Sequence, residues 1–170
     1  MRGYIHLYTG NGKGKTTAAL GLAMRASGAG KSIFIAQFVK GKPYSEHEAI
    51  KHLPEITIMQ FGLDCFIINN PTEKDIKAAQ TGFNYVKKIS EENKHDIIIL
   101  DEITIALHYK LIDINDVLQF LKNKYSQTEI ILTGRFAPDK LIDAADLVTE
   151  MKEIKHYYNN GVEARKGIES

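Results

Sequence analysis

The stretch that decides the fold covers residues 4–25 and reads YIHLY, then TGNGKGKTT, then AALGLAMR. Its first five residues are mostly apolar and predict a buried strand. Three glycines then predict a tight turn, because Gly10, Gly12 and Gly14 accept backbone angles and close approaches that a Cβ atom blocks. The alanine- and leucine-rich segment that follows predicts a helix. The stretch therefore predicts a strand, a glycine-rich phosphate loop and a helix in direct succession.

The predicted turn has the chemistry of an anion-binding site. Its backbone N–H groups can point inward, and the following helix adds the positive end of its dipole. Lys15 is placed to reach the outer phosphates of a nucleotide, and the Thr16 hydroxyl is placed to bind Mg²⁺. Thr9 stands where the common pattern has its first glycine, which follows one residue later. The alternative is a glycine-rich turn with an exposed lysine, but the strand, the Gly-Lys-Thr sequence and the helix all favour the phosphate loop.

Length and composition favour a single globular domain, residues 1–170. Hydrophobic residues make up 44% of the chain and charged residues 25%, which is ordinary for a soluble domain. A net charge of +1 disfavours a broad surface for nucleic acid or membrane, so we expect neither partner. A single cysteine, Cys65, rules out an internal disulfide and fits a reducing compartment. The sequence has no bilayer-spanning apolar stretch or signal-peptide core, so we expect a cytoplasmic protein.

A second half-site follows a later strand. Residues 96–100 are almost entirely aliphatic and run directly into Asp101 and Glu102. In a nucleotide site, one such carboxylate holds Mg²⁺ and the other orients a ligand or a water. An aliphatic strand that ends in acids is a weak pattern alone, but together with the phosphate loop it is strong. We expect this strand to lie beside the phosphate-loop strand, so that the two half-sites meet.

Other polar residues lie at strand ends, where open α/β sheets gather their functional groups. Gln37 and Lys40 follow a strand at residues 32–36, and Lys40 is equally compatible with a plain solvated lysine. Arg135 follows a strand at residues 129–133 and could brace a carboxylate or meet a phosphate. Arg25 lies nearly three helical turns beyond the loop, and its spacing alone favours a surface arginine.

Strands and helices alternate along the chain, which predicts an α/β fold. We expect a three-layer architecture like that of the phosphate-loop NTPases, with a mostly parallel sheet flanked by helices. Residues 146–151 are expected to form a last central strand. Asn159-Asn160-Gly161 is typical of a hairpin turn, so the tail is expected to add antiparallel strands at one edge. Further strands are expected at residues 56–60 and 129–133, and helices at residues 46–51, 72–92, 104–109, 113–122 and 138–144.

The chain resembles the phosphate-loop type of ATP:cob(I)alamin adenosyltransferases, also called corrinoid adenosyltransferases. The resemblance covers nearly the whole chain, and the unusual loop with Thr9 is part of it. The combination is specific even though each piece alone is not. The matching segments are residues 9–19, 25–26, 37–38, 40–41, 100–102, 132–135, 145–151, 155–156 and 167–169.

The resemblance implies a reaction in which the Co(I) of a reduced corrinoid attacks the 5′ carbon of ATP. Adenosylcobalamin forms and triphosphate leaves. The nucleophile belongs to the corrinoid, which agrees with a sequence that offers no nucleophile–base pair. An electron donor such as a flavoprotein and a homodimer are implied as partners.

The resemblance also assigns roles to individual residues. Catalytic roles fall to Lys15, Thr16 and Glu102, and metal binding to Thr16, Asp101 and Glu102. Arg25 and Arg135 gain ligand-contact roles. The residues implied to hold the triphosphate are Gly10, Asn11, Gly12, Lys13, Gly14, Lys15, Thr16 and Thr17.

One departure from the family concerns the corrin ring. The family usually places a Phe and a Trp against it from the loop that matches residues 62–69, but this chain has no Trp. Phe66 is the nearest aromatic residue and is the candidate for that contact. Two other functions stay open from the residues alone. One is a small nucleotide kinase or a RecA-like ATPase, although no arginine-bearing lid is found. The other is a module that binds ATP without chemistry.

Overall fold

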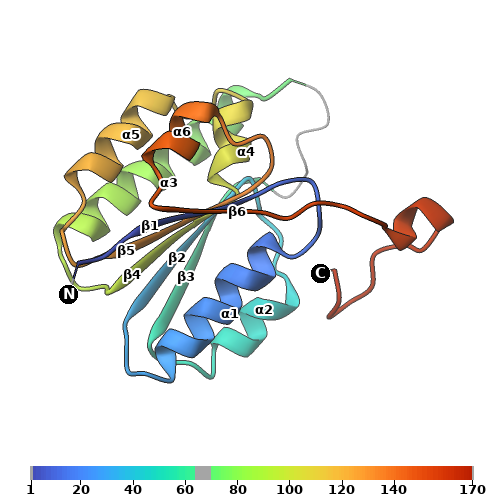
Figure 1. The fold of residues 1–170 in the computed structure, drawn as a ribbon, viewed down its shortest axis with the longest axis horizontal. Helices are drawn as coiled ribbons and strands as arrows, with labels where there is room; N and C mark the ends of the chain where they lie inside the picture. Colours follow the sequence, from blue (N-terminus) through green and yellow to red (C-terminus); the bar gives the residue numbers. More distant parts are fainter. Residues whose placement is uncertain (1, 64–69, 170) are drawn as a thin grey trace.

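In the part of the chain that the structure describes, six parallel strands form the central sheet, with helices on both of its faces (Figure 1). The computed structural model describes residues 2–63 and 70–169. The three-layer α/β architecture predicted from the sequence is confirmed. In chain order the strands are β1 (Ile5–Thr9), β2 (Ile33–Phe38), β3 (Ile56–Phe61), β4 (Ile97–Asp101), β5 (Glu129–Thr133) and β6 (Leu147–Glu150).

The helices divide between the two faces of the sheet (Figure 1). One face carries α1 (Lys15–Ser27) and α2 (Ser45–Ile50). The opposite face carries the other four of the described α-helices, and a short 3-10 helix, η1 (Tyr157–Asn160), lies in the tail. None of the described helices is long and apolar enough to cross a membrane. The four helices of the second face are α3 (Glu73–Glu91), α4 (Ile103–His108), α5 (Ile114–Asn123) and α6 (Asp139–Ala144).

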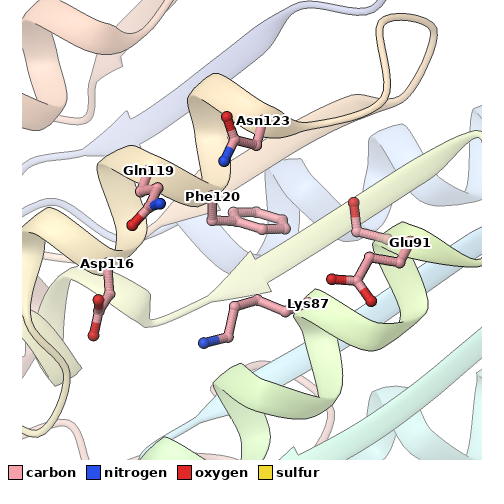
Figure 2. Close-up of a pocket in the computed structure, with 7 residues that line it drawn as sticks. Lys87, Glu91, Asp116, Gln119, Phe120 and Asn123 are labelled. Atoms are coloured by element: carbon pink, nitrogen blue, oxygen red, sulfur yellow. The ribbon is translucent and has the colours of Figure 1, made fainter.

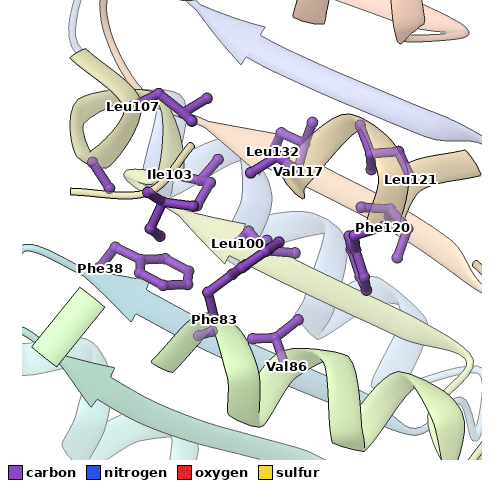
Figure 3. Packing of buried hydrophobic residues seen from close by; sticks show 14 of the residues in the cluster. Phe38, Phe83, Val86, Leu100, Ile103, Leu107, Val117, Phe120, Leu121 and Leu132 are labelled. Carbon is purple, nitrogen blue, oxygen red and sulfur yellow. The ribbon is translucent and has the colours of Figure 1, made fainter. Parts of the chain in front are cut away.

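Strands β1 to β5 supply side chains to two hydrophobic cores, one under each helical layer. On β2, Phe34 and Phe38 pack toward α3, whereas Ile33 and Ile35 pack toward α1. All six residues of β2 are buried, as expected for a parallel strand covered on both faces. Figure 3 shows the larger core, in which side chains of α3 and α5 lie over β4 and β5. These cores fix the strands whose carboxyl ends carry the site.

The strand order is β3-β2-β4-β5-β1-β6, which corrects one expectation. The aspartate strand β4 does not lie beside the phosphate-loop strand β1, because β5 pairs with both and separates them. Local sequence pattern identifies a strand but does not encode its neighbours. The two half-sites still meet, because α1 crosses the sheet and brings Thr16 to Asp101.

Two expectations for the end of the chain are also wrong. Strand β6 is not central: among the described strands it pairs only with β1, in parallel, and its four residues are exposed. The Asn-Asn-Gly sequence does not turn a hairpin, because residues 157–160 form η1 and Gly161 ends it at φ +83°. A left-handed glycine suits a helix end as well as a hairpin turn. In the described part of the tail, no strand follows that could pair back.

Candidate functional site

The phosphate loop closes around its own lysine. Gly14 has φ +115° and directly precedes α1, whose first residue is Lys15. The Lys15 ammonium donates a hydrogen bond of 2.7 Å to the carbonyl oxygen of Gly12. Burial lowers the pKa of Lys15, while the negative charge of Glu102 opposes this effect. The loop thus presents a buried cation beside the acidic end of β4.

Asp101 is the point at which the two half-sites join. It is 1% exposed, and four side chains donate hydrogen bonds to it. Its Oδ1 accepts from Thr16 at 2.9 Å and from Thr133 at 2.6 Å. Its Oδ2 accepts from Lys40 at 2.8 Å and from Gln37 at 3.2 Å. The meeting of Thr16 with Asp101 is therefore as predicted, and Thr133, which the sequence analysis missed, completes it.

Lys40 is part of this cluster and is not a solvated lysine. Its ammonium also lies 3.4 Å from the Thr16 hydroxyl, and its side chain is 15% exposed. Burial alone would lower the pKa of Lys40, but the carboxylate of Asp101 outweighs burial and raises it. A positive charge thus lies against both Thr16 and Asp101, two of the three residues to which a metal was assigned from the sequence.

The same groups fit a magnesium ion. Mg²⁺ prefers oxygen ligands and usually combines one or two carboxylates with substrate phosphates and water. Thr16 and Asp101 offer such oxygens 2.9 Å apart, at a position where Lys40 already supplies a cation. Within residues 2–63 and 70–169, no cluster of three or more His, Cys, Asp or Glu side chains forms a metal cage. The described residues therefore fit a magnesium ion whose remaining ligands come from substrate phosphates and water.

Glu102 follows Asp101 in a strained conformation. Its φ is +60°, and its backbone N–H donates to the Thr133 hydroxyl at 3.0 Å. Left-handed backbone at a non-glycine residue costs about 1 kcal/mol or more. The neighbouring loop leaves room for it, since a Cβ at Gly134 would lie 2.2 Å from the Thr104 hydroxyl oxygen and 3.1 Å from a Glu102 carboxyl oxygen. Burial, together with the charge of Asp101, raises the pKa of Glu102.

Arg135 lies at the carboxyl end of β5, on the same edge of the sheet. The Thr104 hydroxyl donates to its carbonyl oxygen at 2.6 Å, which pins this loop to the first turn of α4. Beside the larger effect of burial, the positive charge of Arg135 also lowers the pKa of Lys15. The exposed guanidinium is therefore electrostatically coupled to the loop lysine, as a residue of the same site would be.

The outer side of the phosphate loop packs against the segment after β6. The N–H of Gly12 donates to the Met151 carbonyl at 2.6 Å. A Cβ at Gly10 or at Gly12 would lie 2.5 or 2.7 Å from that oxygen. These glycines therefore admit the chain's own backbone, a role that the sequence analysis did not foresee. Lys13 also turns outward and bonds the tail, while Asn11 and Thr17 are exposed.

Arg25 is separate from the Asp101 cluster. It lines an open cavity of about 550 Å³ beside α1, together with Tyr8, Leu22 and Met24. The cavity begins at Ala18, one turn beyond the phosphate loop. The surface position that spacing favoured is confirmed. Burial raises the pKa of the Tyr8 phenol on the cavity wall.

A second cavity, of about 250 Å³, lies between α3 and α5 (Figure 2). Lys87, Glu91, Asp116 and Asn123 are among the residues that line it. None of the predicted site residues belongs to it, and it lies on the face of the sheet opposite α1. Phe66, the predicted corrin contact, falls outside the described residues.

These features define the class of the protein. A glycine loop that leads into a helix, an acid at the end of a parallel strand, and cations around both are the combination typical of phosphate-loop nucleotide-binding proteins. The fold agrees with this class. It resembles the crystal structure of flagellar accessory protein FlaH from Methanocaldococcus jannaschii, with a TM-score of 0.62 and 12% identity, over 88% of this chain and 71% of that one.

The chain belongs to the family described as ATP:corrinoid adenosyltransferase BtuR/CobO/CobP, whose model matches residues 1–170. The corrinoid adenosyltransferase of Escherichia coli K12 is 36% identical over 170 residues, which cover 99% of this chain and 86% of that protein. The corrinoid adenosyltransferase of a Sinorhizobium species is 37% identical over 99% of this chain and 80% of its own. Corrinoid adenosyltransferase CobA of Salmonella typhimurium LT2 is 35% identical over 99% of this chain and 86% of its own length.

Proposed function

We propose that this protein transfers the 5′-deoxyadenosyl group of ATP to the Co(I) of a reduced corrinoid, giving adenosylcobalamin and triphosphate. The observation that carries the proposal is the junction of the phosphate loop with Asp101, in a chain whose whole length matches the family. A cobalt–carbon bond forms while the bond between C5′ and the triphosphate oxygen breaks, and its electron pair leaves with the triphosphate. We take residues 1–170 to act as one nucleotide-binding domain.

The contribution of the chain is to bind the nucleotide and to stabilise the leaving group. The corrinoid supplies the nucleophile, so no side chain has to remove a proton. Lys15 is the buried cation of the loop, and its charge would offset the charge that develops on the departing triphosphate. The remaining residues of the loop, 10–17, would hold the phosphates through backbone N–H groups and the helix dipole.

Magnesium is part of the proposal. Thr16 and Asp101 would hold it, with Glu102 beside them. When bound, Mg²⁺ supplies positive charge that neutralises the polyphosphate. Arg135 would add its guanidinium from the end of β5. Arg25 would contact the ligand from the cavity beside α1.

Three further parts of the proposal follow from the family. A reduced corrinoid requires an electron donor, for which a flavoprotein is suited. We also propose a homodimer and a cytoplasmic location. A role for Phe66 beside the corrin ring stays a prediction from the resemblance.

One assay tests the proposed function. The protein is incubated with ATP, Mg²⁺ and chemically reduced cobalamin, while the absorption spectrum and the phosphate products are followed. A cobalt–carbon bond together with triphosphate is the expected result. ADP with phosphate, or a phosphorylated acceptor, would instead indicate an ATPase or a kinase. Binding of ATP without any product would indicate a sensing module.

A further inference from the structure

The tail of the chain lies along the outer side of the phosphate loop. In Figure 1 it continues from β6 past the turn between β1 and α1. The N–H of Met151 donates to the Thr9 carbonyl at 2.8 Å, and the Met151 carbonyl accepts from Gly12 at 2.6 Å. The tail backbone thus extends the pairing of β6 with β1 into the loop itself.

Lys13 ties the far end of the tail to the same loop. Its ammonium donates to three tail acceptors: the Tyr157 hydroxyl at 3.2 Å, the Ile168 carbonyl at 2.8 Å and a Glu169 carboxyl oxygen at 2.7 Å. It also lies 5.9 Å from the centre of the Tyr157 ring. Three acceptors on one ammonium satisfy its full donor capacity. The side chain of Lys13 is therefore committed to the tail.

The tail presents these acceptors as an organised group. The Tyr157 hydroxyl also donates to Glu169. The backbone N–H of Arg165 donates to the other Glu169 oxygen at 2.8 Å, and its guanidinium lies 5.0 Å from the centre of the Tyr157 ring. The hydrogen bond from Lys13 is the main cause that lowers the pKa of Glu169, and Glu169 in turn raises the pKa of Lys13. The pair is charged throughout the neutral range.

As a result, both backbone polar groups of Gly12 are held, each by a different partner. Its N–H is bonded to Met151 in the tail, and its carbonyl is bonded to the buried ammonium of Lys15. Lys13 follows directly and anchors the same turn to Glu169. A loop held in this way is already ordered before it meets a nucleotide, so less conformational entropy is lost on binding.

We propose that Tyr157 and Glu169 are positioning residues, which hold the phosphate loop through Lys13 in the shape that receives the triphosphate of ATP. We call these three side chains the tail clasp. The inference rests on the proposed function, because it deepens the account of the same ATP site. The tail clasp acts on nucleotide binding, and it does not touch the reacting atoms.

The test compares Glu169→Gln and Tyr157→Phe with a matched control, Glu163→Gln. Glu163 is exposed in the same tail, and no hydrogen bond or ion pair with another described residue is found for it. Binding of Mg²⁺·ATP is measured by calorimetry without corrinoid, and KM and kcat are measured with reduced cobalamin. Glu169→Gln and Tyr157→Phe are expected to weaken ATP binding and to raise the KM for ATP, by about tenfold for the charge-removing Glu169→Gln, or roughly 1.4 kcal/mol. At saturating ATP, kcat and the KM for the corrinoid should stay within twofold of wild type.

A double-mutant cycle adds a readout that general loss of structure would not give. If Glu169 acts through Lys13, Lys13→Met combined with Glu169→Gln should bind ATP no more weakly than the weaker single variant. The inference is overturned if Glu169→Gln binds ATP like wild type, or if kcat falls while ATP binding is unchanged. Tighter binding by Glu169→Gln would also overturn it, since the tail would then withhold Lys13 from the phosphates.

The same measurements separate the inference from the proposed function. Wild-type protein that binds ATP but forms no adenosylated corrinoid would overturn the proposed function alone, and the binding comparison would still decide the tail clasp. Wild-type protein that turns over, with variants equal to it in ATP affinity, would overturn the tail clasp alone. Wild-type protein that binds no ATP would overturn both.

Discussion

The ammonium of Lys40 lies 2.8 Å from the carboxylate of Asp101, so a lysine that follows β2 compensates the buried acid at the end of β4. The Thr16 hydroxyl is bonded to the same acid and lies 3.4 Å from the same ammonium. Before any nucleotide binds, the site is therefore electrically balanced by a side chain. A divalent cation that binds between Thr16 and Asp101 has to displace this ammonium or share the acid with it.

Replacing Lys40 by methionine is expected to lower the free energy of unfolding of the ligand-free protein by about 2–3 kcal/mol, because Asp101 then keeps a buried charge without its cation. Mg²⁺·ATP should restore much of this loss, so its effect on Tm should be larger in the variant than in wild type. Thermal unfolding with and without Mg²⁺·ATP measures both effects. The exposed Lys42→Met serves as the control, and equal ligand-induced shifts in Lys40→Met and wild type would contradict the role of Lys40 as a stand-in for the metal.

Replacing Lys15 by alanine is expected to reduce adenosyl transfer at least a hundredfold, by analogy with the loss of one preorganised charge-stabilising group. The fold should stay intact, because burial already disfavours the charge of this lysine in the folded state. Single-turnover formation of adenosylcobalamin measures the first effect, and circular dichroism with thermal unfolding measures the second. Near-normal turnover would count heavily against the assignment of the phosphate loop as the ATP site.

Glu102→Gln is expected to raise the free energy of unfolding and to lower the turnover. Burial, with Asp101 beside it, raises the pKa of Glu102 above its ordinary 4.5. At pH values between 4.5 and the pKa of Glu102 in the folded state, the folded protein binds more protons than the unfolded chain. The free energy of unfolding therefore falls as the pH rises through this range, and it stays lower at higher pH. The neutral amide avoids this cost. At pH 8 we expect the variant to gain about 1 kcal/mol, or roughly 3 °C in Tm, while turnover falls.

The pH dependence of that gain is its sharpest check. Thermal unfolding of wild type and Glu102→Gln should converge below pH 4, where the carboxyl of Glu102 is protonated in both states. The exposed Glu91→Gln should follow wild type across the range. A gain in Tm of equal size at pH 4 and at pH 8 would show that charge is not its source.

Thr133→Val tests the threonine of β5 whose hydroxyl is bonded to both Asp101 and the Glu102 N–H. Valine keeps the shape but removes the donor to Asp101 and the acceptor of the Glu102 N–H. We expect a loss of about 1–3 kcal/mol in the free energy of unfolding, because two buried polar groups lose a partner. Binding of Mg²⁺·ATP should weaken as well, since Asp101 is less well oriented. Urea unfolding and calorimetry measure the two effects, with Thr57→Val, an exposed threonine on β3, as control. Unchanged ATP affinity would remove Thr133 from the site.

The helices and strands were predictable because their signals are local. Thr72 and Asp75 form a capping box at the start of α3, and Asp113 caps α5 through the N–H of Asn115. The order of the strands was not predictable in this way. Nothing in residues 96–101 specifies that β5 lies between β4 and β1, since that order depends on contacts between distant segments. The edge position of β6 was missed for the same reason.

The residues of the candidate site likewise differ in whether their signal is local or depends on the strand order. Residue types in a fixed local spacing identified Lys15, Thr16 and Asp101, and the structure brings them together. Thr133 was missed because a threonine at a strand end has many uses, and only the strand order makes it a neighbour of Asp101. Lys40 could have been assigned only by knowing that β2 and β4 are adjacent.

The contact of Met151 with the phosphate loop has a consequence for biosynthesis. The loop is made well before the backbone that supports it at Gly12, because Met151 follows Gly12 by more than a hundred residues. A nascent chain on the ribosome therefore carries an unsupported loop until the segment around Met151 has emerged. Chains that terminate before Met151 should consequently bind ATP poorly, since their loop lacks this backbone contact.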